Sequence, residues 1–430
     1  MSQIQLRRAV ASSFVGSLIE YYDFLLYATA SAVVFNKVFF ANLDPLVGTI
    51  ASFGTFATCY LVRPIGGVIF GHFGDLLGRK RMLVLTMTMM GLASFLIGVL
   101  PTYAQVGGLA PVGLIVLRVV QGISVGGEWG GSVLMSAEHA TTRRGLWASF
   151  TNAGAPAGTV VSTGAMTATN AIVGDEAFLD WGWRIPFLLS LVLLAVGLFI
   201  RTRVEETPAF RAVQQDVPRR RLPVAEVLRE HPRTLMLAIG IGLAAFVAQS
   251  TLTTFVISYG VRMGHQRQAV LNALTISSTC AIVGILAWSA ASDRFGRRPI
   301  VLTGAIAMAF YGFILFPLVD NGSTAPLTLA LVIGQGIIHP MMYGPLAAMY
   351  SELFSTENRY TGASLGYQIA GLGAGFAPLL FAWIQRTSGG TDTTAISFLI
   401  AGFCALTVTC VLALQETNRR ELTRSTVVAS

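Results

Sequence analysis

Five ionisable side chains lie inside otherwise apolar stretches of this sequence: Glu20, Asp23, Arg63, Arg118 and Glu128. A charged group at mid-membrane depth costs about 3 kcal/mol or more unless it is paired or hydrated, so such residues are functional candidates. Carboxylates in these surroundings can bind and release protons, and a buried arginine can bind a carboxylate. The chemistry that these residues predict is proton transfer combined with recognition of an anion.

The spacing of these residues places them on two helical faces. Two sets recur at intervals of three or four residues: Gly16, Glu20, Asp23 and Tyr27, and Arg118, Gln121, Val125 and Glu128. Residues at this spacing share one side of a helix, and we expect both sides to line a hydrated interior. Movement of Arg118 relative to Asp23 or Glu20 would release or capture a proton. A fixed ion pair that joins the two helices is the alternative.

Arg63 and a group of neutral polar residues are candidates for binding the solute. Arg63 lies deep in the second apolar stretch, where it can bind a substrate carboxylate or pair permanently with Asp23 or Glu20. The amide, imidazole and phenol groups of the second half suit a small polar solute. The candidate substrate-binding residues are Arg63, Tyr27, Gln121, Gln249, Gln335, His339, Tyr343, Tyr367 and Gln368. His339 precedes Pro340, so it is either a proton relay or a residue that bonds a carbonyl at a helix kink.

The sequence lacks the signatures of an enzyme. It has no nucleophile–base set, no metal-ligand spacing and no phosphate-binding loop. The cysteines Cys59, Cys280, Cys404 and Cys410 lie in apolar stretches and are interpreted as small buried hydrophobic residues. We therefore expect no catalysis, no metal and no cofactor.

The composition requires elements that face lipid. Hydrophobic residues make up 53% of the 430 residues and charged residues 12%, about half the share in soluble proteins. The first apolar stretch contains Glu20 and Asp23 and no small-residue cleavage site, so we expect it to remain in the mature protein. Twelve apolar runs are long enough to cross a membrane. These predicted spans are 12–36, 47–70, 82–100, 109–135, 147–172, 183–201, 234–260, 268–290, 299–319, 326–350, 361–384 and 395–415.

The basic residues predict the orientation. Most of the 29 Lys and Arg residues fall in loops on the side of the N-terminus. The other side receives only Lys37, Arg184, Arg262, Arg267 and Arg386. Because basic loops stay in the cytoplasm, both termini are predicted to be cytoplasmic. Basicity is thus a topology signal, and no nucleic-acid partner is expected. The longest basic loop, 201–233, is expected to lie against anionic lipid, with a regulatory role as the alternative.

The two halves of the chain repeat. Asp75 and Asp293, Glu138 and Glu352, and Glu206 and Glu416 recur in the same order at nearly constant separation. Internal repeats of this kind are typical of transporters built from two bundles around a central pathway. We therefore divide the chain into an N-terminal six-helix bundle (1–200), a cytoplasmic linker (201–233) and a C-terminal six-helix bundle (234–430). The expected fold class is an all-α membrane protein that spans the bilayer twelve times.

Five motifs resemble one known family. GHFGDLLGRKR (71–81) resembles the loop motif of the major facilitator superfamily. RVVQGISVGGEWGG (118–131) is similar to the fourth-span motif of its metabolite:H⁺ symporter family. EYYDFLLYA (20–28), WGWRIPF (181–187) and GYQIAGLGAGFAPL (366–379) fit the same family, in its shikimate-type branch. Ser289 departs from the glycine usual at this point of the second loop motif. The antiporter motif of the fifth span is only partly met at 154–158, which favours symport.

The resemblance implies proton-coupled symport of a small organic acid by alternating access, in a monomer of the bacterial inner membrane. Its partners would be the solute, protons and the lipid bilayer. Because other branches carry proline and betaine, uptake of a zwitterionic compatible solute is the alternative. Within the loop motifs, Asp75 and Asp293 can cap a facing helix, and Arg79 and Arg297 can bind carboxylates or helix C-termini. These four residues are the predicted gate, and Glu128 is an alternative inner gate or proton exit.

Overall fold

The computed structural model describes residues 3–77, 79–140, 142–202, 223–354, 359–387 and 393–418. Within these ranges the secondary structure is entirely helical. The long helices of the first half are α1 (Gln3–Val33), α3 (Pro45–Leu77), α4 (Arg79–Val99), α6 (Leu109–His139), α7 (Arg144–Val173) and α9 (Arg184–Thr202). Short segments between them are α2 (Phe35–Val38), α5 (Tyr103–Val106), α8 (Asp175–Ala177) and the π-helical η1 (Phe178–Gly182).

The second half contains two spans that π-helical turns interrupt. The first combines α12 (Pro232–Ser250), η2 (Thr251–Phe255) and α13 (Val256–Arg262), and the second combines α16 (Thr324–Leu331), η3 (Val332–Ile338) and α17 (His339–Leu353). The remaining helices are α11 (Pro223–Glu230), α14 (Arg267–Phe295), α15 (Arg297–Asp320), α18 (Arg359–Thr387) and α19 (Thr394–Ala413). The predicted spans agree with these helices to within a few residues, except that α1 begins earlier, at Gln3, and α3 ends later, at Leu77.

Ten helical segments of the described chain are long and apolar enough to cross a membrane. The two other long helices, α1 and α7, are not apolar enough to belong to this set, and they pack against one another and against the second half. Their position between the halves shields them from lipid, which explains why they tolerate polar side chains. With these two, the structure accounts for the twelve predicted spans.

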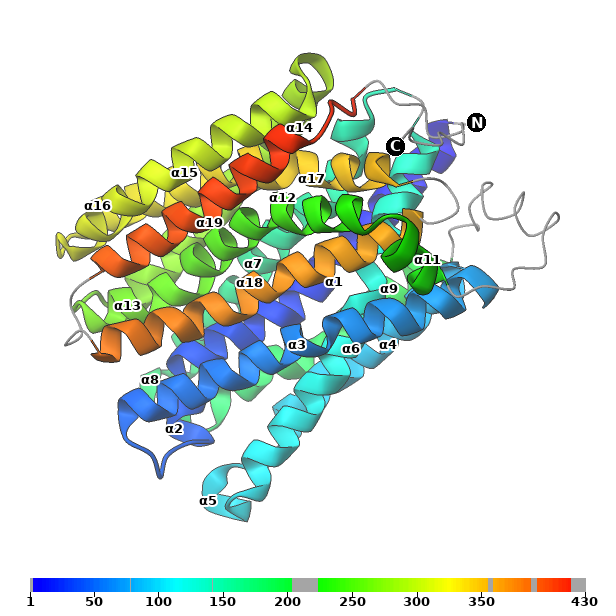
Figure 1. The fold of residues 1–430 in the computed structure, drawn as a ribbon. Helices are drawn as coiled ribbons and strands as arrows, with labels where there is room; N and C mark the ends of the chain where they lie inside the picture. Colours follow the sequence, from blue (N-terminus) through cyan, green and yellow to red (C-terminus); the bar gives the residue numbers. More distant parts are fainter. Residues whose placement is uncertain are drawn as a thin grey trace.

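The two halves lie side by side (Figure 1). Helix α7 packs against α14 and α3 packs against α18, so each half contributes to both contacts. The chain termini and α11 lie at one end of the molecule, here called the terminal face. The short helices α2, α5 and α8 lie at the other end, here called the opposite face.

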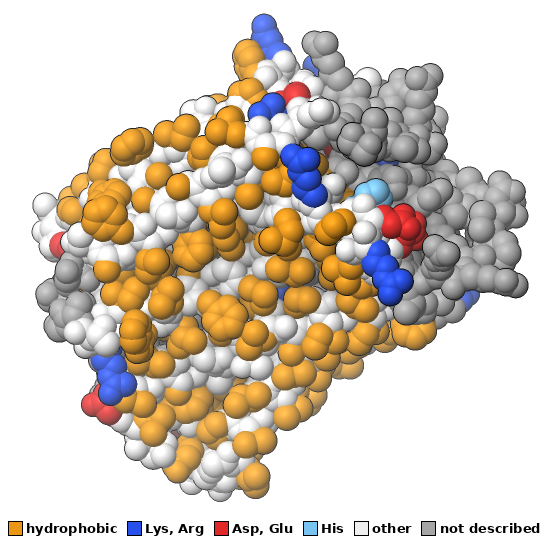
Figure 2. Space-filling view, viewed as in Figure 1, with side chains coloured by type: hydrophobic (Ala, Val, Ile, Leu, Met, Phe, Trp, Pro, Cys, Tyr) orange, Lys and Arg blue, Asp and Glu red, His pale blue; other side chains and the backbone are white. Residues whose placement is uncertain are grey.

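The surface between these faces is apolar. Figure 2 shows hydrophobic side chains across the middle of the molecule, with charged groups mainly toward the ends. Large side chains such as Phe310, Phe199 and Met236 are exposed there. Exposure of this extent is expected where the solvent is lipid.

Glycines bring α3 and α6 unusually close. A Cβ atom at Gly126 would lie 2.1 Å from the carbonyl oxygen of Arg63, and one at Gly122 would lie 2.2 Å from that of Cys59. Only glycine fits such backbone contacts, as is common between membrane helices. This contact fixes the depth and direction of Arg63.

Candidate functional site

The polar side of α1 faces the interior of the first half. Glu20, Asp23 and Tyr27 are buried among α3, α4, α6 and α9, whereas Tyr21 points to the second half. The shared helical face was predicted correctly from the spacing. In this structure the face is covered by neighbouring helices of the same half, and the hydrated lining stays a prediction. Spacing shows which residues share a face, but it does not show which helix covers that face.

Asp23 connects to Arg118 through a chain of neutral groups. Ser190 of α9 donates a hydrogen bond of 2.5 Å to Asp23, and the Ser94 hydroxyl of α4 lies close to the same carboxylate. Ser94 in turn accepts a hydrogen bond of 2.7 Å from the Gln121 amide. The Gln121 carbonyl oxygen accepts one of 2.8 Å from Arg118. These contacts form a continuous polar path across the first half.

Arg118 is held by aromatic rings rather than by an acid. Its guanidinium lies 3.8 Å from the ring centroid of Tyr27, whose hydroxyl shares a hydrogen bond of 2.6 Å with Thr55. Among the described residues, Arg118 forms no ion pair, and its Nε and Nη2 atoms have no hydrogen-bond partner. The proposed pairing of Arg118 with Asp23 or Glu20 is therefore not formed in this conformation. The alternative of a fixed ion pair between α1 and α6 fails for the same reason.

Arg63 is also buried without an acidic partner. Only 2% of it is exposed, and its guanidinium lies 4.1 Å and 4.4 Å from the ring centroids of Tyr60 and Phe24. No ion pair of Arg63 is present in the described part of the chain, so permanent pairing with Asp23 or Glu20 is not observed. Glu20 lies on the facing helix α1, and its Oε2 atom also has no hydrogen-bond partner among the described residues.

Glu128 forms a buried ion pair with Arg201, a residue that sequence reasoning assigned to the loop. Arg201 lies inside α9, and its guanidinium also donates a hydrogen bond of 3.2 Å to the carbonyl oxygen of Leu83. Gly16 leaves the necessary space, because a Cβ atom there would lie 2.2 Å from Arg201 Nη2. The linker boundary at 201 was therefore wrong for this residue: the last turn of the span carries a buried cation.

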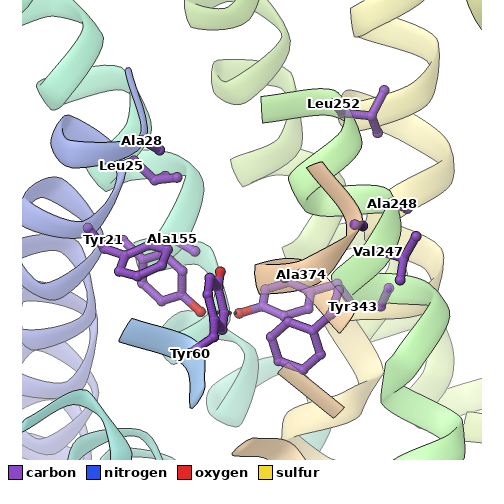
Figure 3. Packing of buried hydrophobic residues seen from close by; sticks show 14 of the residues in the cluster. Tyr21, Leu25, Ala28, Tyr60, Ala155, Val247, Ala248, Leu252, Tyr343 and Ala374 are labelled. Atoms are coloured by element: carbon purple, nitrogen blue, oxygen red, sulfur yellow. Dashed lines mark hydrogen bonds between the residues drawn. The ribbon is translucent and has the colours of Figure 1, made fainter. Parts of the chain in front are cut away.

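Aromatic side chains join the halves at the centre of the molecule. The hydroxyls of Tyr21, Tyr343 and Tyr367 hydrogen-bond to one another at 2.8–3.0 Å. Figure 3 shows Tyr21 and Tyr60 pointing toward Tyr343 from across the interface. Trp129 stacks on Tyr367, with 3.5 Å between the ring centroids. Sequence reasoning selected the two tyrosines of the second half but missed Tyr21 and Trp129, although both lie in the quoted motifs.

The other candidates of the second half are distributed over its interior. His339 is buried and stacks beside Tyr343, with 5.2 Å between the centroids. Gln335 is fixed by Ser277 and Ser278 of α14, at 2.7 and 2.9 Å. Gln368 reaches across the interface to the carbonyl oxygens of Val125 and Gly126, both at 3.3 Å. Gln249 is half-buried at the end of α12, away from these contacts.

The terminal face carries the predicted helix cap. Both carboxylate oxygens of Asp293 accept hydrogen bonds from the first turn of α7, from Gly145 N at 2.8 Å and Leu146 N at 3.0 Å. Arg297 pairs with Asp293 at 2.8 Å and with Glu352 at 3.3 Å. This arrangement joins the halves at the terminal face. The side chains of Asp75 and Arg79, the corresponding pair of the first half, lie outside the described residues.

Comparison with known proteins identifies the family. The model of the Major Facilitator Superfamily matches residues 14–287 and 265–428. The chain belongs to the major facilitator superfamily. This major facilitator protein is 38% identical over 426 residues to the shikimate transporter of Escherichia coli K12, and the match covers 97% of each chain. It is 34% identical over 444 residues to the proline/betaine transporter of Salmonella typhimurium, covering 99% of this chain and 87% of the relative.

A solved structure shows the same fold. The proton:xylose symporter XylE bound to 6-bromo-6-deoxy-D-glucose superimposes with a TM-score of 0.75, at 18% identity over 98% of both chains. The predicted fold class is thus confirmed. As a major facilitator protein, the chain is a multi-spanning membrane transporter and not an enzyme.

Proposed function

We propose that this chain is a proton-coupled symporter of a small carboxylate-bearing metabolite, of the shikimate type, working by alternating access. The observation that carries the proposal is the buried Arg63 guanidinium, which forms no ion pair with any described residue although Glu20 lies on the facing helix. A buried cation is costly unless an anion compensates it. The carboxylate of a bound solute supplies that anion and can accept two parallel hydrogen bonds from the guanidinium.

The proposed solute site lies between Arg63 and the central tyrosines. Arg63 would bind the carboxylate, while Tyr21, Tyr343 and Tyr367 would exchange their mutual hydrogen bonds for bonds to solute hydroxyls. Gln368, His339, Gln335 and Gln249 remain candidates for the second half of the site, and Tyr27 and Gln121 act through Arg118. The similarity to the shikimate transporter supports this choice of solute class.

The proposed proton path uses Asp23 and Glu20. Asp23 ends a polar path that begins at Arg118, and Glu20 lies on the same helix facing Arg63 and the Glu128–Arg201 pair. A carboxylate that is not committed to an arginine can take up and release a proton as the helices move. Glu128 is committed to Arg201, so we assign it a structural role in this conformation.

A zwitterionic compatible solute such as proline or betaine is the second candidate. Aromatic rings attract an ammonium group, and Tyr60, Tyr343, Tyr367 and Trp129 lie at the proposed site. The similarity to the proline/betaine transporter points the same way. Both candidates carry a carboxylate, so both need Arg63.

The remaining features follow from the same proposal. The protein acts as a monomer in the bacterial inner membrane without a cofactor, driven by the proton gradient. Both termini are cytoplasmic, so the terminal face is the inner face. The N-terminal bundle extends to the end of α9 at Thr202, and the C-terminal bundle begins with α12 at Pro232. Residues 203–222 of the proposed linker lie outside the described residues.

Liposomes that contain the purified protein test the proposal. Shikimate, other organic acids, proline and glycine betaine are added separately while internal pH is recorded, and a true substrate acidifies the lumen. Arg63→Gln should raise the half-saturation concentration of that substrate about ten- to hundredfold, because a hydrogen-bonded charge is lost. Arg63→Lys keeps the charge and should raise the half-saturation concentration less. Unchanged half-saturation in correctly folded Arg63→Gln would contradict the assignment.

A further inference from the structure

A large pocket opens between the halves at the opposite face. Its volume is about 880 Å³, within the range of ligand pockets. It is lined from the first half by α2, α7 and α8, and from the second half by α13 and α14. Its polar lining includes Lys37, Asn170, Asp175, Gln266, Arg267 and Gln268. Two cations, one acid and several amides make this lining suited to an anion.

An ion pair spans this pocket. Arg267 Nη2 of α14 lies 2.8 Å from Asp175 Oδ1 of α8, and Asn170 donates a hydrogen bond of 2.9 Å to the same oxygen. The bond from Asn170 and the charge of Arg267 hold the pKa of Asp175 below its ordinary value, so the acid is ionised at neutral pH. Asp175 is 79% exposed, whereas Arg267 is 23% exposed. The arginine is therefore the fixed partner, and the acid can withdraw into water.

The same pair belongs to the contacts that close this face. Thr163 and Thr275 share a hydrogen bond of 2.9 Å across the halves, and Gln268 donates one of 3.2 Å to Thr167. These neutral contacts, like the ion pair, join α7 or α8 to α14. Loss of the ion pair would leave these neutral bonds and the packing of α7 on α14 to hold the face shut.

We propose that this pocket is a capture site for carboxylate solutes, at which the solute carboxylate replaces Asp175 on Arg267 and so removes the ion pair between the halves. Binding of the solute and opening of the face then occur together, because Arg267 exchanges its ion pair with Asp175 for one with the solute carboxylate. Lys37 and the amides hold the rest of the solute. The inference rests on the proposed function only for the presence of a carboxylate, which both candidate solutes carry.

Two variants with opposite expected effects test the inference. Arg267→Gln removes the binding group and should raise the half-saturation concentration for uptake about three- to fivefold. Asp175→Asn removes the carboxylate that competes with the solute for Arg267, and it should lower the half-saturation concentration by a similar factor. Uptake of labelled shikimate and of labelled glycine betaine into liposomes is measured at low salt. High salt should reduce both shifts, because the site is open to solvent.

Arg386→Gln is the matched control, since Arg386 ends α18 at the same face but does not line the pocket. It should leave half-saturation unchanged. If the pair merely held the face closed, both variants would remove the same contact and shift uptake in the same direction, which would overturn the capture site alone. Absence of uptake of every carboxylate by the wild-type protein would instead overturn the proposed function, and this inference with it.

Discussion

Arg63, Arg118 and Arg201 are all buried in the first half, but their partners differ. Arg201 is paired with Glu128, whereas Arg63 and Arg118 lie against aromatic rings. The attraction between a ring face and a cation is worth about 1–2 kcal/mol. This is less than the free-energy cost of burying a charge without an ionic partner. The two arginines held by rings are therefore able to accept an anion, and Arg201 is not.

We predict that the pair Arg201–Glu128 stabilises the fold. Arg201→Gln leaves the Glu128 carboxylate buried without a cation, which should cost about 3–5 kcal/mol. The double variant Arg201→Gln/Glu128→Gln replaces both charges and should recover most of the loss. Thermal unfolding of the purified variants in detergent measures the cycle. A double variant as unstable as Arg201→Gln would show that Arg201 acts through other contacts, such as the one to Leu83.

A second prediction concerns Asp23, which forms no ion pair with any described residue. Asp23→Asn mimics the protonated acid, and its amide oxygen can still accept the bond from Ser190. Accumulation of solute against its gradient should be abolished, whereas exchange of labelled for unlabelled solute should persist. Both are measured in liposomes, with and without a pH gradient.

Stability provides the control for Asp23→Asn. Since Arg118 is not paired with Asp23, the variant should unfold within about 1 kcal/mol of the wild type. Uphill accumulation by the variant would remove Asp23 from the proton path and leave Glu20 as the candidate.

The sequence located the buried charges but not their partners. Apolar flanks were sufficient to place Asp23, Arg63 and Glu128 inside spans. Arg201 was missed because it lies in the last turn of α9, where a span and a basic loop have the same composition. Partners depend on helix rotation and neighbours, and neither is encoded in local spacing.

At the level of elements, the close contact of α3 and α6 sets the position of Arg63. We predict that Gly126→Ala forces the helices apart, since its Cβ would lie 2.1 Å from the Arg63 carbonyl oxygen. Overpacking of this kind costs about 1–3 kcal/mol and should weaken solute affinity. The measurements are melting temperature and half-saturation. Gly54→Ala on α3 is the matched control, because its Cβ would meet nothing within 4 Å; equal effects of both variants would refute the contact argument.

The helices themselves were predicted well because apolar length is a strong local signal. Helices α1 and α7 were also found, although both are too polar to qualify by hydropathy alone. Their polarity has a structural reason, since they lie between the halves. The π-helical turns η2 and η3 were not predicted, because a wider turn does not change the composition of an apolar run in any way that the sequence reveals.

At the scale of the whole molecule, the halves are joined at both faces. We predict that Asp293→Asn weakens the terminal contact, because an amide offers one acceptor where the α7 cap uses two oxygens and a charge. The change should shift the balance between conformations by about 1 kcal/mol. Transport rate should therefore change severalfold more than half-saturation, and uptake kinetics measure both. Loss of affinity at an unchanged rate would place Asp293 in the binding site instead.

The repeat of Asp75 and Asp293 predicted a cap at a facing helix, and the Asp293 cap is found between the halves. Which face of the membrane this is remains a prediction from the basic loops. The contacts of the opposite face could not be foreseen, because Asp175 and Arg267 lie far apart in the sequence and belong to no repeat.

The π-helical turn η3 also sets the rotational register of the helix that follows it. Each residue of an α-helix turns the chain by about 100°. A π turn accommodates one residue more than an α turn, so the side chains after η3 are rotated by about that angle relative to an uninterrupted helix. His339 and Tyr343 follow η3 directly, and Tyr343 meets Tyr21 across the interface. A chain shorter by one residue within 332–338 would close this turn, and Tyr343 would then point into its own half.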